Sequence, residues 1–195
     1  MGYSFIEKPK GENGSKGSNN KSSFVSITPE WTLDQIVFPD SLKEQLEDII
    51  SFCKHKDQII NEWELYKFMK GKGCIGINLW GIPGTGKSIA AEAIASALGM
   101  QLIQASYSSL MYSLQGNTEK NISALFEKAV NENCVILFDE ADGLLSARKT
   151  NGSNSDSSNL IKSHLLNILD RSTAIVGFTT NFFKSYDRAF VRRIL

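Results

Sequence analysis

Short apolar runs bounded by turn-forming residues recur along the chain and predict buried β-strands. The runs span residues 75–80, 101–105, 134–138 and 174–178. Before and between them, apolar residues recur at spacings of three and four, which is the pattern of helices that cover a sheet. Such helices are predicted over residues 42–50, 89–98 and 122–129. Strands that alternate with helices are typical of an α/β fold with a mostly parallel sheet.

Two polar stretches interrupt this pattern. Residues 1–23 consist mostly of Gly, Ser, Asn and Lys, so they bury too little apolar surface to offset their conformational entropy. We therefore predict a disordered tail over residues 1–25 and one domain over residues 26–195. Residues 149–159 have the Gly, Ser and Asn content of a surface loop within that domain.

The composition narrows the classes of partner. The chain carries 21 Lys and Arg against 21 Asp and Glu. This balance disfavours nucleic acid and anionic membranes as partners, because proteins that bind them carry an excess of basic side chains. The apolar runs are much shorter than the ~20 residues of a membrane-spanning helix, and the N-terminus lacks the apolar core of a secretory signal. We therefore expect a cytoplasmic protein without a membrane partner.

A phosphate-binding motif follows the first predicted strand. The segment Gly81-Ile-Pro-Gly-Thr-Gly-Lys87-Ser88 matches G-x-x-x-x-G-K-[ST] and opens a predicted helix, although a glycine-rich turn that binds nothing is the alternative. Glycines let backbone N–H groups wrap around a phosphate, and the helix N-terminus adds partial positive charge. Lys87 would reach the β and γ phosphates of a nucleotide, and the Ser88 hydroxyl would bind Mg²⁺. The candidate nucleotide-binding residues here are Gly81, Pro83, Gly84, Thr85, Gly86, Lys87, Ser88 and Ile89.

Two carboxylates follow the third predicted strand. Asp139 and Glu140 lie at the strand end where open α/β sheets place their ligands. Asp139 is suited to Mg²⁺, a hard cation that prefers carboxylate oxygen, and Glu140 could polarise an attacking water. Taken alone, Glu140 could equally stabilise a helix start, but a phosphate loop in the same chain favours catalysis. Asp142 is a weaker candidate for a functional carboxylate, because it could simply cap the following turn.

These motifs together resemble the AAA+ ATPases, in particular the AAA branch that remodels or unfolds proteins. The resemblance covers residues 31–195, with residues 81–88 matching the Walker A motif and residues 135–140 matching Walker B. It implies a three-layer αβα sandwich, the P-loop NTPase fold, with a mostly parallel sheet. It also implies an ATPase that uses ATP and Mg²⁺.

The same resemblance assigns further residues. Asn181 matches sensor 1, which contacts the γ phosphate and helps to position water, although an asparagine in a turn is common. Arg192 and Arg193 match the arginine fingers that AAA ATPases insert into the neighbouring subunit's nucleotide; two solvated arginines would give the same pattern. Ile36 and Val37 match the segment that contacts adenine. The catalytic candidates are thus Lys87, Glu140, Asn181, Arg192 and Arg193.

Two departures from the family pattern bear on function. A loop of the family often presents an aromatic residue and a glycine to a central pore, whereas this chain keeps Gly116 but has Leu114 at the aromatic position. The chain ends at Leu195, before the last sheet strand and the helical lid that carries sensor 2 in the family. We therefore expect weak nucleotide binding and slow turnover for residues 1–195 alone.

The leading hypothesis is an ATP-hydrolysing AAA+ core that works in a homo-oligomeric, hexameric ring and remodels a protein partner. One alternative is an ATP-binding switch or adaptor with little turnover, which the two departures favour. A second alternative is a DNA-processing loader ATPase, which shares the motifs. The zero net charge of the chain makes that alternative weaker.

Overall fold

The computed structural model describes residues 24–62, 64, 74–106, 110, 118–146, 155–181 and 186–194. Within them lies a five-stranded sheet, formed by β1 (Ser26–Ile27), β2 (Ile75–Trp80), β3 (Gln101–Ser106), β4 (Cys134–Asp139) and β5 (Ile175–Thr180). The strands lie in the order β1, β3, β4, β5, β2. All neighbouring strands are parallel except β1 and β3. The predicted α/β fold with a mostly parallel sheet is confirmed.

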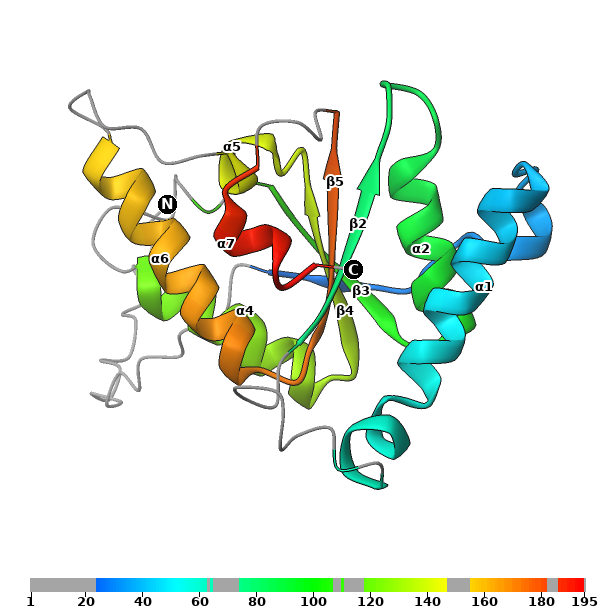
Figure 1. The fold of residues 1–195 in the computed structure, drawn as a ribbon, viewed down its shortest axis with the longest axis horizontal. Helices are drawn as coiled ribbons and strands as arrows, with labels where there is room; N and C mark the ends of the chain where they lie inside the picture. The colour runs from blue at the N-terminus through cyan, green and yellow to red at the C-terminus, as the bar shows by residue number, and fades with distance from the viewer. Residues whose placement is uncertain are drawn as a thin grey trace, which may run out of the picture.

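Helices cover both faces of this sheet (Figure 1). One face carries α1 (Asp40–Lys54) and α2 (Lys87–Ala97), and the other carries α4 (Thr118–Asn131), α6 (Ser155–Arg171) and α7 (Arg188–Val191). Shorter helices are η1 (Leu33–Gln35), the π-helix η2 (Gln58–Glu62) and α5 (Asp142–Leu145). These layers form the predicted three-layer αβα sandwich. Of the helices that the structure describes, none combines the length and the apolar character that a membrane crossing requires.

β4 lies at the centre of the hydrophobic core, because both of its faces are covered. Ile136 and Phe138 belong to the cluster formed with α4 and α6, whereas Val135 and Leu137 belong to the cluster formed with α1 and α2. The ring of Phe138 also stacks on Phe178 of β5, with 5.4 Å between the centroids. Each such buried side chain contributes about 1.5–3 kcal/mol. The residues that follow β4 are therefore attached to a rigid support.

All four predicted strands are present in the predicted order, and the bounds of three of them differ by one or two residues from the prediction. β3 and β4 each extend by one residue, to Ser106 and Asp139. β5 begins at Ile175 and ends at Thr180, rather than spanning residues 174–178. The added residues are polar, because the hydrogen bonds of a sheet join backbone groups and continue beyond the apolar run. Strand ends therefore reach further toward the loops than the apolar pattern indicates.

β1 is an element that the sequence does not predict, because two residues are too few for a pattern. It forms by antiparallel pairing with β3, in which Ser26 lies opposite Ile103. Phe24, which composition groups with the tail, is only 6% exposed and joins the core. Lys128 Nζ on α4 donates a hydrogen bond to the Phe24 carbonyl oxygen, 2.9 Å away. The disordered tail is predicted over residues 1–25, of which residues 1–23 lie outside the described residues.

The prediction of a loop over residues 149–159 is wrong for its second part. α6 begins at Ser155, so residues 155–159 are helical. Ser, Asp and Asn are favoured at helix starts, where their side chains accept hydrogen bonds from free N–H groups. Ile161 and Leu165 pack in the hydrophobic core, and this packing stabilises the helix although its first turn is polar. Residues 149–154 lie outside the described part of the chain.

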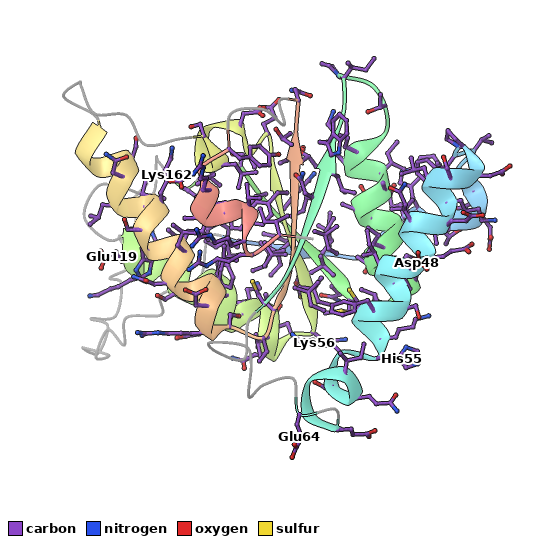
Figure 2. All side chains as sticks on the ribbon, viewed as in Figure 1. Asp48, His55, Lys56, Glu64, Glu119 and Lys162 are labelled. Carbon is purple, nitrogen blue, oxygen red and sulfur yellow. The ribbon has the colours of Figure 1, made fainter. Side chains whose placement is uncertain are left out.

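A buried lysine joins two layers at one end of the sheet. Lys56, between α1 and η2, is 9% exposed, and its Nζ donates a hydrogen bond to the Thr173 carbonyl oxygen, 2.5 Å away and just before β5 (Figure 2). Burial lowers the pKa of this ammonium group. The contact attaches the α1 layer to the amino end of β5, away from the loops at the opposite end.

Candidate nucleotide-binding site

Three loops leave neighbouring strands at the same edge of the sheet. The strand register pairs Trp80 with Thr180 and Phe138 with Phe178, so the carboxyl ends of β2, β5 and β4 lie side by side. Open α/β sheets bind their ligands at this edge. The loop between β2 and α2 extends from it (Figure 1). The residues that leave the three strand ends are Gly81, Glu140 and Asn181.

The loop between β2 and α2 has the backbone that a phosphate cradle requires. Gly84 and Gly86 have φ angles of +82° and +83°, in the left-handed region that residues with a Cβ avoid. α2 begins directly afterwards at Lys87. The first N–H groups of a helix have no partner within the helix, and the helix dipole adds partial positive charge there. The loop and the start of α2 thus offer donors and positive potential to an anion.

Lys87 links this loop to the end of β5. Its Nζ donates hydrogen bonds to the carbonyl oxygens of Gly81 and Ile82, at 2.9 and 3.0 Å, and to Oδ1 of Asn181, at 3.0 Å. The sequence prediction placed both Lys87 and Asn181 at the γ phosphate, and the structure brings the two side chains together. Phosphate oxygens carry more negative charge than carbonyl oxygens, so they are stronger acceptors for this ammonium group.

The two residues predicted to bind Mg²⁺ also meet. Ser88 Oγ donates to Asp139, with distances of 3.3 Å to Oδ1 and 3.4 Å to Oδ2. Hydroxyl and carboxylate oxygens are the hard ligands that Mg²⁺ prefers. Among the described residues, no group of three His, Cys, Asp or Glu side chains could hold a metal ion. A cation here would therefore need phosphate and water oxygens as its further ligands.

Glu140 occupies a strained turn directly after β4. Its side chain is exposed, and its φ angle is +51°. For a residue other than glycine this conformation costs about 1–2 kcal/mol. Two hydrogen bonds offset the strain, because the Glu140 N–H donates to Thr179 Oγ1 at 3.0 Å and to Asp139 Oδ1 at 3.2 Å. Such local strain concentrates at functional sites, and here it sets the direction in which the Glu140 side chain leaves the strand.

Comparison with known proteins agrees with this geometry. Residues 77–195 match the family described as "ATPase family associated with various cellular activities (AAA)". The chain belongs to this AAA family of ATPases. The family predicted from the motifs is therefore confirmed, and so is the enzyme class.

The alignments with individual relatives cover most of this chain but only a small part of each relative. The chain is 39% identical to peroxisomal ATPase pex6 of Schizosaccharomyces pombe, over 77% of this chain and 15% of the relative. It is 31% identical to vacuolar protein sorting-associated protein 4 of Dictyostelium discoideum, over 80% of this chain and 33% of the relative. The crystal structure of the FIGL-1 AAA domain is similar with a TM-score of 0.66 and 27% identity, covering 89% of this chain and 56% of that chain. The chain thus spans a third or less of these two curated relatives.

The remaining predicted nucleotide-binding residues of the AAA domain line the same loop. Thr85 Oγ1 donates to the Ile82 carbonyl oxygen at 2.9 Å, which closes the loop on itself. Pro83 is exposed, and Ile89 is half-buried in the first turn of α2. Their contact with a nucleotide stays a prediction.

The predicted adenine contacts lie close in sequence to an element that packs against α2. Ile36 and Val37 follow η1, which packs against α2. Ile36 is half-buried, whereas Val37 is 99% exposed. The adenine contact of both residues stays a prediction.

The two arginines after α7 have different environments. Arg193 donates from Nε and Nη2 to the two carboxylate oxygens of Asp170, each at 2.6 Å, and from Nη1 to the Ala189 carbonyl oxygen, also at 2.6 Å. The hydrogen bonds between Arg193 and Asp170 lower the pKa of Asp170 and raise the pKa of Arg193. Arg192 is exposed, and its side chain forms no hydrogen bond or ion pair with the described residues. The two predicted arginine fingers are therefore not equivalent.

Sequence reasoning missed two buried residues at the end of β5 that form hydrogen bonds with carboxylates at and after the end of β4. Thr179 and Thr180 are buried, and their hydroxyls donate hydrogen bonds to Oδ1 of Asp139 and of Asp142. Asp142 therefore binds β5, while the residue at the cap of α5 is Ala141. The available signal was a pair of polar residues at the end of an apolar strand. The departure at Leu114 and Gly116 falls outside the described residues.

Proposed function

We propose that this AAA domain binds ATP with Mg²⁺ and hydrolyses it, and that it works in a homo-oligomeric, hexameric ring to remodel a protein partner. One observation carries the proposal. Lys87 lies 3.0 Å from Asn181, and Ser88 lies 3.3 Å from Asp139, so the phosphate loop and the acidic strand end form a single site. Membership of the AAA family supports ATP as the nucleotide.

The residues of the site have separate roles in the proposed transfer of a phosphoryl group to water. The loop N–H groups and Lys87 bind the β and γ phosphates and stabilise the charge that develops in the transition state. Glu140 accepts a hydrogen bond from the attacking water, orients it and takes up its proton as a general base. Asn181, next to Lys87, holds the γ phosphate in line with that water.

Ser88 and Asp139 fit the magnesium ion that this reaction needs, because a hydroxyl and a carboxylate lie together beside the phosphate loop. The Ser88 hydroxyl would bind the ion directly, and Asp139 would bind it directly or through water. When bound, Mg²⁺ neutralises negative charge on the phosphates.

The environments of the arginines support a ring in which neighbouring subunits complete each other's sites. An arginine at the γ phosphate stabilises the transition state when it is supplied from another subunit. Arg193 is bound to Asp170 of its own chain, so we assign this role to Arg192. The name of one relative, vacuolar protein sorting-associated protein 4, supports a protein as the partner.

The function is tested by measuring ATP hydrolysis at rising protein concentration, with Mg²⁺ and with EDTA, while light scattering reports the mass of the assembly. We expect the activity per subunit to rise steeply as the protein assembles, because each site needs an arginine from its neighbour. EDTA should abolish the activity.

Other outcomes would favour the alternatives. ATP binding without turnover at every concentration would mean that the domain is an ATP-binding switch or adaptor. DNA binding that weakens with salt would indicate a loader ATPase. Activity that does not change with assembly would contradict the ring.

Arg192→Ala is expected to slow hydrolysis by the assembled protein by roughly 10³-fold, with ATP affinity unchanged. Arg193→Ala should instead lower the melting temperature, because it leaves the Asp170 carboxylate without its partner. Both variants are compared with wild-type protein for hydrolysis, nucleotide affinity and melting temperature.

Mixing subunits adds a control for Arg192. Lys87→Ala subunits retain Arg192, and Arg192→Ala subunits retain an intact phosphate loop. A mixture of the two inactive proteins should therefore regain part of the activity. If Arg193→Ala abolished hydrolysis at an unchanged melting temperature, the assignment of the two arginines would be reversed.

A further inference from the structure

We infer that Asp142 is a positioning residue of the ATPase site, which fixes Asn181 in place beside Lys87. The inference rests on the proposed role of Asn181 in hydrolysis. Within the described part of the chain, Asp142 forms no hydrogen bond or ion pair with Lys87 or the phosphate loop, so we infer that it acts through Asn181. Its contribution is a pair of hydrogen bonds that anchor the end of β5.

One carboxylate oxygen of Asp142 makes both bonds. Oδ1 accepts a hydrogen bond from the Thr180 hydroxyl and a second from the backbone N–H of Asn181, at 3.3 Å. Thr180 is only 1% exposed and Asn181 is half-buried, so both groups have limited contact with water. Removing the carboxylate takes away the acceptor that they share, which is costly where access of water is limited.

The side chain of Asn181 contacts the phosphate loop, while its backbone contacts Asp142. The Asn181 backbone N–H faces Asp142, and its side-chain Oδ1 accepts a hydrogen bond from Lys87 Nζ at 3.0 Å. The position of that side chain relative to Lys87 therefore depends on where Asp142 holds the backbone. A catalytic group that shifts by about 1 Å can lose on the order of 100-fold in rate.

Tyr186 forms a second contact with the end of β5 and links it to β2. Tyr186, just before α7, donates a hydrogen bond from its hydroxyl to Asn78 Oδ1 on β2 at 2.9 Å, and it also bonds to Thr180. Burial raises the pKa of Tyr186, so the phenol stays protonated at neutral pH. Thr180 thus lies between Asp142 and Tyr186, and the end of β5 has two fixed neighbours.

The kinetic test compares Asp142→Ala, Asp142→Asn, Asn181→Ala and the double variant Asp142→Ala/Asn181→Ala, in the assembled protein. We expect Asp142→Ala to lower kcat by about 10-fold or more with little change in KM for ATP, because the phosphate loop and Lys87 remain. Asp142→Asn keeps an oxygen acceptor and should lose less. If Asp142 acts through Asn181, adding Asp142→Ala to Asn181→Ala should change kcat by less than about 2-fold.

Three results would overturn the inference. The first is a double variant whose loss in kcat equals the product of the losses in the two single variants. The others are equal losses in kcat in Asp142→Ala and Asp142→Asn, and an Asp142→Ala protein in which KM rises while kcat does not fall. Asp48→Ala is the matched control, because Asp48 is an exposed carboxylate on α1 in the opposite helical layer (Figure 2). It should match wild-type protein.

Amide hydrogen exchange tests the same inference without relying on turnover. In Asp142→Ala we expect the Asn181 amide to lose protection. The amides of Ala141 and Gly81, which donate to the carbonyl oxygens of Thr179 and Thr180 at 2.8 and 3.2 Å, should keep theirs. Loss of protection at all three amides would mean that Asp142 supports the whole sheet edge, which would overturn the inference. If Asn181→Ala hydrolysed ATP at the normal rate, the proposed role of Asn181 would fail, and the exchange experiment alone would still decide whether Asp142 positions it.

Discussion

Lys87→Ala is expected to weaken ATP binding by about 100-fold and to reduce hydrolysis by a further factor on the order of 10³. The ammonium group lies within 3.0 Å of Gly81, Ile82 and Asn181, at the point where the loop and the end of β5 meet. No other lysine or arginine among the described residues forms a hydrogen bond or ion pair with this loop, so no basic side chain of the same chain replaces the lost charge there. Nucleotide affinity measured by calorimetry and turnover measured with Mg²⁺ check the two effects.

Lys43→Ala is the matched control for this variant. Lys43 is an exposed lysine of α1 that pairs with Glu47 at 4.0 Å, so its removal should leave binding and turnover unchanged. The melting temperature of Lys87→Ala should stay near the wild-type value, because the side chain is not part of the hydrophobic core. ATP affinity at the wild-type level in a folded Lys87→Ala protein would contradict the assigned site.

Glu140→Gln is expected to reduce turnover by roughly 10²–10⁴-fold while leaving ATP binding unchanged. Glutamine has nearly the same shape, but it cannot take a proton from the attacking water. The backbone should keep its turn, because the bonds from the Glu140 N–H to Thr179 and Asp139 do not involve the side chain. Single-turnover hydrolysis and nucleotide affinity, measured on the same preparation, separate the two effects.

The control for Glu140→Gln is Glu119→Gln. Glu119 is an exposed glutamate in the first turn of α4, in the helical layer opposite α2 (Figure 2). Its substitution should not change turnover. An assembled Glu140→Gln protein that hydrolyses ATP at the normal rate would assign the activation of water to another group.

Much of the fold was predictable because its signals are local. A strand that is buried on both faces must be apolar along its length, so residues 134–138 were recognisable without knowledge of their neighbours. The phosphate loop was predictable for the same reason, because the φ angles of Gly84 and Gly86 require glycine at fixed places in a short segment. Chemistry that depends on a few consecutive residues is visible in sequence.

Contacts between distant residues were not predictable in this way. Thr179 and Asp139 lie 40 positions apart and bond through the register of two neighbouring strands. Arg193 matched an arginine-finger position by sequence, yet it pairs with Asp170, 23 positions earlier on α6. A periodic pattern indicates that a residue faces the core or the solvent, and it does not identify the partner that it meets there.

The sequence by itself determined the order and type of β2 to β5 and of the helices α1, α2 and α4, the phosphate loop and the acidic strand end, whereas β1 and α6 were not predicted. These follow from the spacing of apolar residues and from backbone conformations that few residue types allow. Only the tertiary structure decided which strands are neighbours, and hence that Lys87 meets Asn181 and that Asp142 holds the end of β5. The physical reason is that these are long-range hydrogen bonds, whose geometry is set by the packing of the whole sheet between its two helical layers.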